Sequence, residues 1–180
     1  MLVGMKEKLL EAHKRLEARM ARFDDRKIAD GWVALAADEP TTIITTKRGL
    51  RLLVARRIVH GNRVQYEAYI VQGLLRLLLR KPPRVAWMYC QAPMAGRVQV
   101  TNANVYDIRG KDFRLQGIGT AMYDLIEKDV KAAGAEGIEP HWGSLSEDAI
   151  EFWKKRRPDQ ADKIVELNGM YPHTASGLFD

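Results

Sequence analysis

Two glycines at the start of a helix-like pattern are the residues of this chain best suited to bind a charged ligand. The run 114–120 reads R-L-Q-G-I-G-T and leads into apolar residues at helical spacing. Gly117 and Gly119 lack a Cβ, so a ligand can approach the backbone closely there. A helix that begins at this run points its unpaired N–H groups and the positive end of its dipole toward the same place. The pattern therefore predicts a cradle for an anion.

Several anionic cofactors bind at glycine-rich turns, and the spacing of the glycines separates them. The run lacks the G-x-x-x-x-G-K-[ST] of a nucleotide phosphate loop, and it lacks the G-x-G-x-x-G of a dinucleotide-binding turn. What remains is R-x-x-G-x-G, carried by Arg114, Gly117 and Gly119. The plainer alternative is a glycine-containing turn that only starts a helix.

The pattern R-x-x-G-x-G resembles the pyrophosphate-binding segment of the GNAT superfamily of acyl-CoA-dependent N-acyltransferases. The resemblance extends over residues 97–157, which follow the family's order of strand, loop, long helix, strand and helix, while the first half is only loosely similar. It implies an α/β (α+β) fold with a mixed, mostly antiparallel central sheet flanked by helices and a splayed strand pair. It also implies acetyl-CoA as co-substrate.

In such a fold the pantetheine arm fills the gap between the splayed strands, and backbone groups bind it. The resemblance implies that the cofactor-binding residues are Asp107, Ile108, Arg109, Arg114, Leu115, Gln116, Gly117, Ile118, Gly119 and Thr120. A backbone N–H near Ile108 would polarise the thioester carbonyl, as an oxyanion hole does. An amine then attacks the thioester directly, so no enzyme nucleophile is needed.

The proton transfers of this reaction need side chains, and here the sequence departs from the family pattern. Many members place a tyrosine in the last helix to protonate the leaving thiolate, where this chain has Phe152 and Trp153. The catalytic candidates are two carboxylates close to the predicted cleft, Asp107 and Glu139, and a histidine, His141, because the imidazole side chain can act as an acid or a base. Each has a plainer interpretation as a solvated charge or a hydrogen-bonded histidine.

Three further side chains are candidates for the same roles. Ser144 and Tyr106 could replace the absent tyrosine as the acid, and Glu67 could reach the cleft from the first half as the base. No histidine has neighbours at ligand spacing, so no metal site is indicated.

The net charge of the chain gives little information about its binding partners. The net charge of +6 and the isoelectric point near 9.5 would attract coenzyme A, nucleic acid or an anionic membrane alike. The basic cluster 154–157 follows a predicted capping box at Ser144 and Glu147, so it lies where a helix C-terminus favours cations. A plain nucleic-acid-binding domain is disfavoured because the sequence lacks an interleaved run of aromatic and basic residues.

The remaining pattern predicts the elements that position this site. Apolar residues at helical spacing within residues 1–27 predict an amphipathic N-terminal helix that docks on the core or on a second copy in a homodimer. We expect strands at 41–46, 50–60, 63–71, 84–91, 97–108 and 137–142, and a closing hairpin at 164–169. One helix follows the glycine loop and ends at Gly134, a glycine suited to a C-cap, and a second helix covers 147–157. The run 74–79 could be a helix or a strand. Together they predict one domain, residues 1–180, with a cofactor-binding core at 97–157.

These patterns favour an acetyl-CoA-dependent N-acetyltransferase whose acceptor is a primary amine on a small molecule, a protein or an aminoacyl-tRNA. A catalytically degenerate protein of the same fold, acting as a binding or assembly module, is the alternative. The sequence has no signal peptide and no membrane-spanning run, and its lone Cys90 suits a reducing compartment, so we expect a cytoplasmic protein without membrane contact.

Overall fold

The structure is a computed structural model of the 180-residue chain. It describes residues 10–11, 13–15, 17–18, 20–71, 82–108, 111–113, 116–141 and 145–158. The predicted elements at 74–79 and 164–169 lie outside these residues. The chain divides into two compact units, residues 1–139 and 140–180. The expectation of a single domain stays a prediction.

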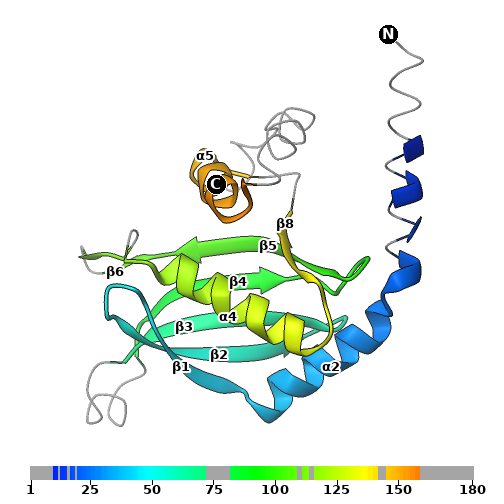
Figure 1. The fold of residues 1–180 in the computed structure, drawn as a ribbon. Coiled ribbons are helices and arrows are strands. Elements are labelled where there is room, and N and C mark those ends of the chain that lie inside the picture. The colour runs from blue at the N-terminus through cyan, green and yellow to red at the C-terminus, as the bar shows by residue number, and fades with distance from the viewer. Residues whose placement is uncertain are drawn as a thin grey trace, which may run out of the picture. The chain divides into compact units, whose positions relative to one another are not determined.

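A six-stranded sheet is the framework of the first unit. Its strands lie in the order β1-β2-β3-β4-β5-β8 (Figure 1). Their bounds are β1 Thr41–Thr45, β2 Arg51–Val59, β3 Arg63–Ile70, β4 Arg84–Cys90, β5 Arg97–Val105 and β8 Gly137–Pro140. The first five strands pair antiparallel in chain order. Four predicted strands in the first half of the chain, 41–46, 50–60, 63–71 and 84–91, are therefore confirmed to within one or two residues.

The turn between β2 and β3 shows why the register of this hairpin is fixed. Residues 60–62 connect the paired residues Val59 and Arg63, and Gly61 and Asn62 both have positive φ, of 76° and 55°, which lets the chain reverse direction within this short loop. The register continues without a break from Leu52 opposite Ile70 to Val59 opposite Arg63. Alternate residues of β2 and β3 therefore face opposite sides of the sheet.

The last strand joins the sheet through a helical crossover. The helix α4, Ile118–Ala132, follows β5 and precedes β8. The Glu136 N–H donates to the Gly96 carbonyl at 2.7 Å, and Gln99 bonds to Glu139, so β8 lies alongside β5 in the same direction. The fold is thus α+β with a mixed, mostly antiparallel sheet, which confirms the predicted class at this level.

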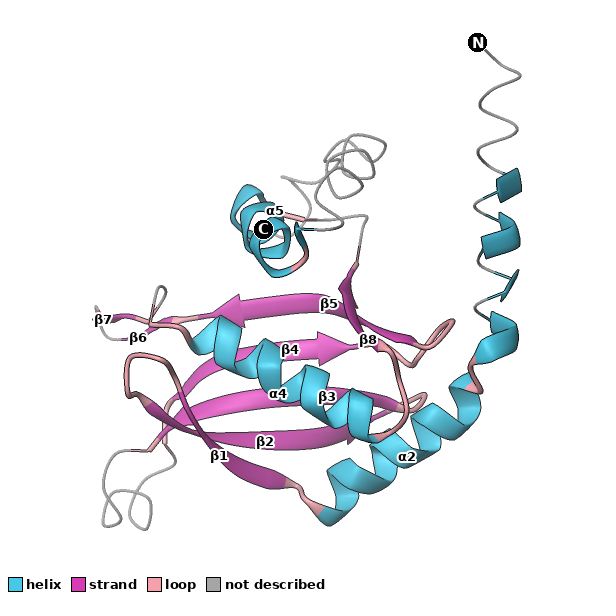
Figure 2. Cartoon of the chain, in the orientation of Figure 1, coloured by secondary structure: helices cyan, strands magenta, loops and turns pink. Residues whose placement is uncertain are grey.

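Two helices pack on one face of the sheet, as Figure 2 shows. α2, Asp25–Asp38, begins where the Asp24 carboxylate accepts from the Lys27 N–H at 3.0 Å. Ala133 is the C-cap of α4, and Gly134 follows it with a φ of 94°, as predicted for the helix end; the Ala135 N–H then donates to the Val130 carbonyl at 2.9 Å. The core between helices and sheet contains Trp32, Leu52, Val54, Tyr66, Met88, Met122 and Ile126, all buried.

Three expectations about elements need correction. The helix α2 was not predicted, because the pattern placed only one N-terminal helix; the described residues between 10 and 22 are indeed helical. The strand expected at 97–108 ends at Val105. The helix α5, Glu147–Arg156, is capped by Ser146, whose hydroxyl accepts from the Ala149 N–H at 3.3 Å, and not by Ser144.

Candidate functional site: the loop before α4 and the end of β5

The two glycines of the predicted cradle have different structural roles. Gly117 is the N-cap of α4 with a φ of 77°, a left-handed conformation that favours glycine. Gly119 lies in the first helical turn, and a Cβ added there would meet no atom within 4 Å. Gly117 therefore permits the turn, whereas Gly119 leaves open space beside the helix start.

The start of α4 has no side-chain cap. Its first intrahelical bond runs from the Ala121 N–H to the Gly117 carbonyl at 3.0 Å. The N–H groups of residues 118–120 precede that bond, so the helix itself supplies them with no acceptor. The Gln116 N–H, by contrast, reaches the Phe113 carbonyl at 3.4 Å. The amides of residues 118–120 are thus available at the helix start, where an anion can bind.

A pocket of about 410 Å³ lies beside this helix start, between β1 and α4. Gly117 and Thr120 line it at the loop end, and Lys47 lines it from the turn after β1. Lys128 and Asp124 line it farther along α4. The loop end of the pocket therefore combines a helix N-terminus with a lysine, which is an arrangement suited to phosphate.

The second half of β5 lacks a described neighbour on its outer edge. Glu136 lies level with Gly96 and Glu139 level with Gln99, so the four residues of β8 reach only as far as about residue 100. Residues 102–104 are exposed on both faces of the sheet. The register with β4 shifts at the preceding residue, Thr101, whose hydroxyl donates to the Tyr89 carbonyl at 3.2 Å. This β-bulge adds one residue to β5 at the start of the open edge, and regular pairing with β4 continues beyond it to Val105.

The predicted pantetheine-binding residues lie after this strand, in a different environment. Asp107 and Ile108 form a short strand, β6, that pairs with β7, Lys111–Asp112, in a separate two-stranded sheet. Part of their backbone hydrogen bonding is therefore used within that hairpin. Arg109, Arg114 and Leu115 lie outside the described residues. The open strand edge is at residues 101–105, earlier in the chain than predicted.

The structure separates two of the three predicted catalytic residues, Asp107 and Glu139. Glu139 is half-buried, lies beside the first half of β5, and accepts from the Gln99 amide at 3.1 Å. Asp107 follows the far end of β5, roughly 20 Å away at the rise of an extended strand. His141 is half-buried and belongs to the second unit. Asp107 and Glu139 therefore cannot both act on one reacting atom in this arrangement.

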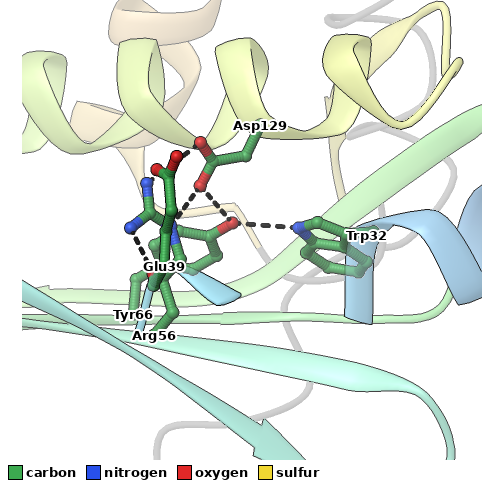
Figure 3. Close-up of polar contacts among 5 residues, drawn as sticks. All are labelled: Trp32, Glu39, Arg56, Tyr66 and Asp129. Atoms are coloured by element: carbon green, nitrogen blue, oxygen red, sulfur yellow. Dashed lines mark hydrogen bonds and ion pairs between the residues drawn. The ribbon is translucent and has the colours of Figure 1, made fainter. Parts of the chain in front are cut away.

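A buried polar network that sequence analysis missed joins the two helices to the sheet (Figure 3). Arg56 of β2 donates to both carboxylate oxygens of Asp129 on α4, at 2.6 and 3.1 Å, and to the Glu39 carbonyl at 2.7 Å. The Tyr66 hydroxyl donates to Asp129 at 2.9 Å and accepts from the Trp32 indole at the same distance. Burial, followed by the Asp129 charge, raises the pKa of Tyr66 well above its ordinary value, so this hydroxyl stays protonated.

A second charged cluster lies on the opposite face of the same strands. The Glu67 carboxylate, only 6% exposed, pairs with Arg57 at 2.6 Å and Arg84 at 2.7 Å, and accepts from the Tyr69 hydroxyl at 2.8 Å. Burial alone would raise the pKa of Glu67, but the hydrogen bonds from Tyr69 and Arg84 and the charges of the two arginines lower it. An ionised carboxylate held by two guanidinium groups is a poor general base, which counts against Glu67 in that role.

The lone cysteine, Cys90, is buried. Burial raises the pKa of its thiol, so the sulfur stays protonated and unreactive, as expected of a structural cysteine. Among the described residues no group of three or more potential ligands could hold a metal ion. In the same part of the chain, no helix is both long and apolar enough to cross a membrane.

Comparison of the chain with protein-family models, with curated proteins and with solved structures finds no match. The function must therefore be argued from the geometry of the site.

Proposed function

We propose that this protein is an acetyl-CoA-dependent N-acetyltransferase of the GNAT type, which transfers the acetyl group to a primary amine. The observation that carries the proposal is the order β5, uncapped glycine loop, α4 and parallel β8. This order joins an anion-binding helix start to a strand with an open edge. A nucleotide thioester needs both features, because its pyrophosphate is anionic and its pantetheine arm is an extended chain of amides.

The residues present fit the two halves of such a co-substrate. The N–H groups of residues 118–120 and the Lys47 side chain would hold the pyrophosphate at the loop end of the pocket. Backbone groups of β5 between Thr101 and Val105 would bind the pantetheine amides in the manner of an added strand. We assign this role to the end of β5 in place of Asp107, Ile108 and Arg109.

The position of Glu139 beside β5 supports a role as the base. Glu139 lies beside β5 about two residues before the bulge, and its only described hydrogen-bond partner is the neutral Gln99 amide. It is therefore the carboxylate best placed to take a proton from an ammonium group, directly or through water. His141 follows it in the chain by two residues and remains the candidate acid. Both assignments depend on the proposed position of the thioester.

The cofactor proposal is tested by calorimetric titration with acetyl-CoA and, in parallel, with acetyl-pantetheine, which lacks the pyrophosphate. We expect micromolar binding of acetyl-CoA that is lost with the shorter analogue. Replacing Gly119 by glutamate should abolish binding, because it adds a negative charge at the helix start, where the pyrophosphate would bind. Gly119→Gln is the control of equal size without charge, and Gly119→Ala is the minimal change. Equal affinity of the Glu and Gln variants for acetyl-CoA would contradict the cradle.

A second candidate function is favoured by one observation in α5. Where a catalytic tyrosine is expected, Phe152 and Trp153 pack edge to face with centroids 5.7 Å apart, and Trp153 is buried. Neither ring can donate a proton to a thiolate. The same fold without turnover would act as an acyl-CoA-binding module. Single-turnover consumption of bound acetyl-CoA with a broad panel of amines would exclude this alternative.

A further inference from the structure

The face of the sheet opposite α2 and α4 gathers arginines that are far apart in the sequence. Within β2, β3 and β4, Arg51, Arg57, Arg63 and Arg84 occupy this face, because alternate residues of these strands point away from the helices. Arg51 and Arg63 are exposed, and the side chains of Arg57 and Arg84 are 62% and 42% exposed. We call this surface the arginine face.

Only one carboxylate opposes these four cations in the three strands. Glu67 is the sole acidic residue of β2, β3 and β4, and it is already paired with Arg57 and Arg84. The arginine face therefore keeps a net positive charge. Because a guanidinium group has five donors, both paired arginines also retain N–H groups for a further partner.

Aromatic rings lie between the arginines. Tyr69, Trp87 and Tyr89 point to the same face and are half-buried. Trp87 lies directly opposite Glu67 on the neighbouring strand, and Tyr89 lies opposite Gln65. The interleaved pattern of aromatic and basic side chains, absent from the linear sequence, is thus created by strand pairing.

The size of the arginine face indicates an extended anion. Arg51 and Arg57 are six residues apart on β2, which is about 20 Å, and Arg84 is two strands away, which is about 10 Å. A single small anion can contact only the cluster around Glu67. A chain of phosphates with unpaired bases can contact the separated arginines and stack on the rings between them.

We propose that the arginine face binds single-stranded nucleic acid, with phosphates on Arg51, Arg57, Arg63 and Arg84 and bases on Trp87 and Tyr89. This proposal goes beyond acyl transfer and does not depend on it. The Glu67 carboxylate holds Arg57 and Arg84 in place, and the two outer arginines contact the chain on either side.

The test is fluorescence anisotropy of a labelled single-stranded RNA of about 16 nucleotides, a length that can cover a face of this size. With three to four phosphate contacts, the logarithm of the binding constant should fall with the logarithm of the KCl concentration at a slope of about −2 to −3. A flat salt dependence, or no binding in about 50 mM KCl, overturns the proposal.

Charge-reversal variants locate the binding surface. Arg51→Glu with Arg63→Glu should lower affinity at least tenfold and make the salt dependence shallower, and both residues lie outside the Glu67 cluster and the acetyl-CoA cradle. The matched control is Arg26→Glu with Lys27→Glu, the same charge change at exposed positions of α2. Equal losses in the two double variants overturn the assignment. Displacement of the RNA by saturating coenzyme A would place the RNA-binding site at the loop before α4. That result would also overturn the assignment to the arginine face.

Base stacking is tested through the tryptophan on this face. RNA should quench Trp87 fluorescence, and Trp87→Leu should weaken single-strand binding about fivefold or more. Trp87→Phe, which keeps an aromatic ring in the packing, should remove the quenching and retain most of the affinity. A duplex of the same length should bind more weakly than the single strand. Binding to phosphatidylserine vesicles but not to RNA would overturn the proposal in favour of a membrane surface.

Discussion

Two consecutive arginines of β2 illustrate how differently the two faces of this sheet are used. Arg56 points toward the helices, is 2% exposed and pairs with Asp129, which is 4% exposed. Arg57 points to the arginine face, is 62% exposed and pairs with Glu67. The same pair of chemical groups is therefore completely enclosed on one face and half open on the other.

The two ion pairs differ in whether their charged groups can still bind a further partner. An enclosed ion pair must satisfy its hydrogen bonds internally, since desolvation is costly. The bonds from Arg56 to Asp129 and Glu39, and from Tyr66 to Asp129, meet that need and hold α4 and the end of α2 on the sheet. On the arginine face the carboxylate is satisfied but the arginines remain accessible. The buried network therefore supports the fold, while the open cluster is available to a partner.

The strongest test of this comparison replaces each arginine by leucine. Arg56→Leu should lower the free energy of unfolding by about 3–5 kcal/mol, because it leaves Asp129 charged and buried without its partner. Arg57→Leu should leave the urea midpoint close to that of the parent, because Arg84 and Tyr69 still satisfy Glu67 and solvent screens the lost charge. Equal losses of stability would show that the two clusters do not differ as described.

A matched pair of tyrosines gives the next largest effect. Tyr66→Phe removes the donor to Asp129 and the acceptor of the Trp32 indole, both in the core, and should cost about 1–3 kcal/mol. Tyr69→Phe removes one of several donors to Glu67 and should cost about 0.5 kcal/mol. Thermal unfolding of the two variants measures the difference. A larger loss of stability in Tyr69→Phe than in Tyr66→Phe would show that the arginine face, and not the buried network, contributes more to the stability of the fold.

Variants at the start of α4 test whether the glycine turn, in addition to the buried network, helps to hold this helix in place. Gly117→Ala places a Cβ in the left-handed region and should cost about 1–2 kcal/mol. Gly119→Ala, in the first helical turn with open space around it, should be neutral or stabilise by up to about 1 kcal/mol. Chemical unfolding of both variants checks the contrast, and two equal effects would mean that the turn does not help to hold α4.

The smallest effect is a pH dependence on the open face. The pKa of Glu67 in the folded protein is lowered from 4.5, so its carboxylate stabilises the fold above that pH and loses its effect as the pH falls through the lowered value. The stability difference between the parent and Glu67→Gln should therefore be largest near neutral pH and shrink below about pH 4. A difference that grows on acidification would show that the pKa is raised instead.

Local patterns in the sequence were sufficient to predict the sheet and α4. Alternating residues and the Gly61–Asn62 turn specify β2 and β3, and glycines mark both ends of α4. The helix α2 was not predicted because its buried positions include small residues, Ala29 and Ala36, which contribute little to a periodic pattern of hydrophobicity. Two serines precede α5. The sequence pattern predicted Ser144 as the cap, whereas the hydroxyl that caps α5 belongs to Ser146.

The two charged clusters could not be predicted from local patterns, because their members meet only through long-range pairing. Arg56 and Asp129 are 73 residues apart. One signal was present: Arg56 continues the alternation of Leu52 and Val54 and so occupies a core-facing position, where a charge needs a buried partner. The sequence also placed the open strand edge too late, at Asp107, because nothing in the composition of β5 marks its bulge.

The bulge at Thr101 gives β5 one residue that is not paired with a residue of β4. Along β2 the pairing is continuous on both sides, so loss of one residue there would turn every later side chain to the wrong face. In β5, loss of Thr101 would only straighten the strand, since Asn102 would still lie opposite Tyr89. Changes in chain length should therefore be tolerated at this point of the sheet and rejected in β2, which makes the bulge a natural place for related chains to differ by a single insertion.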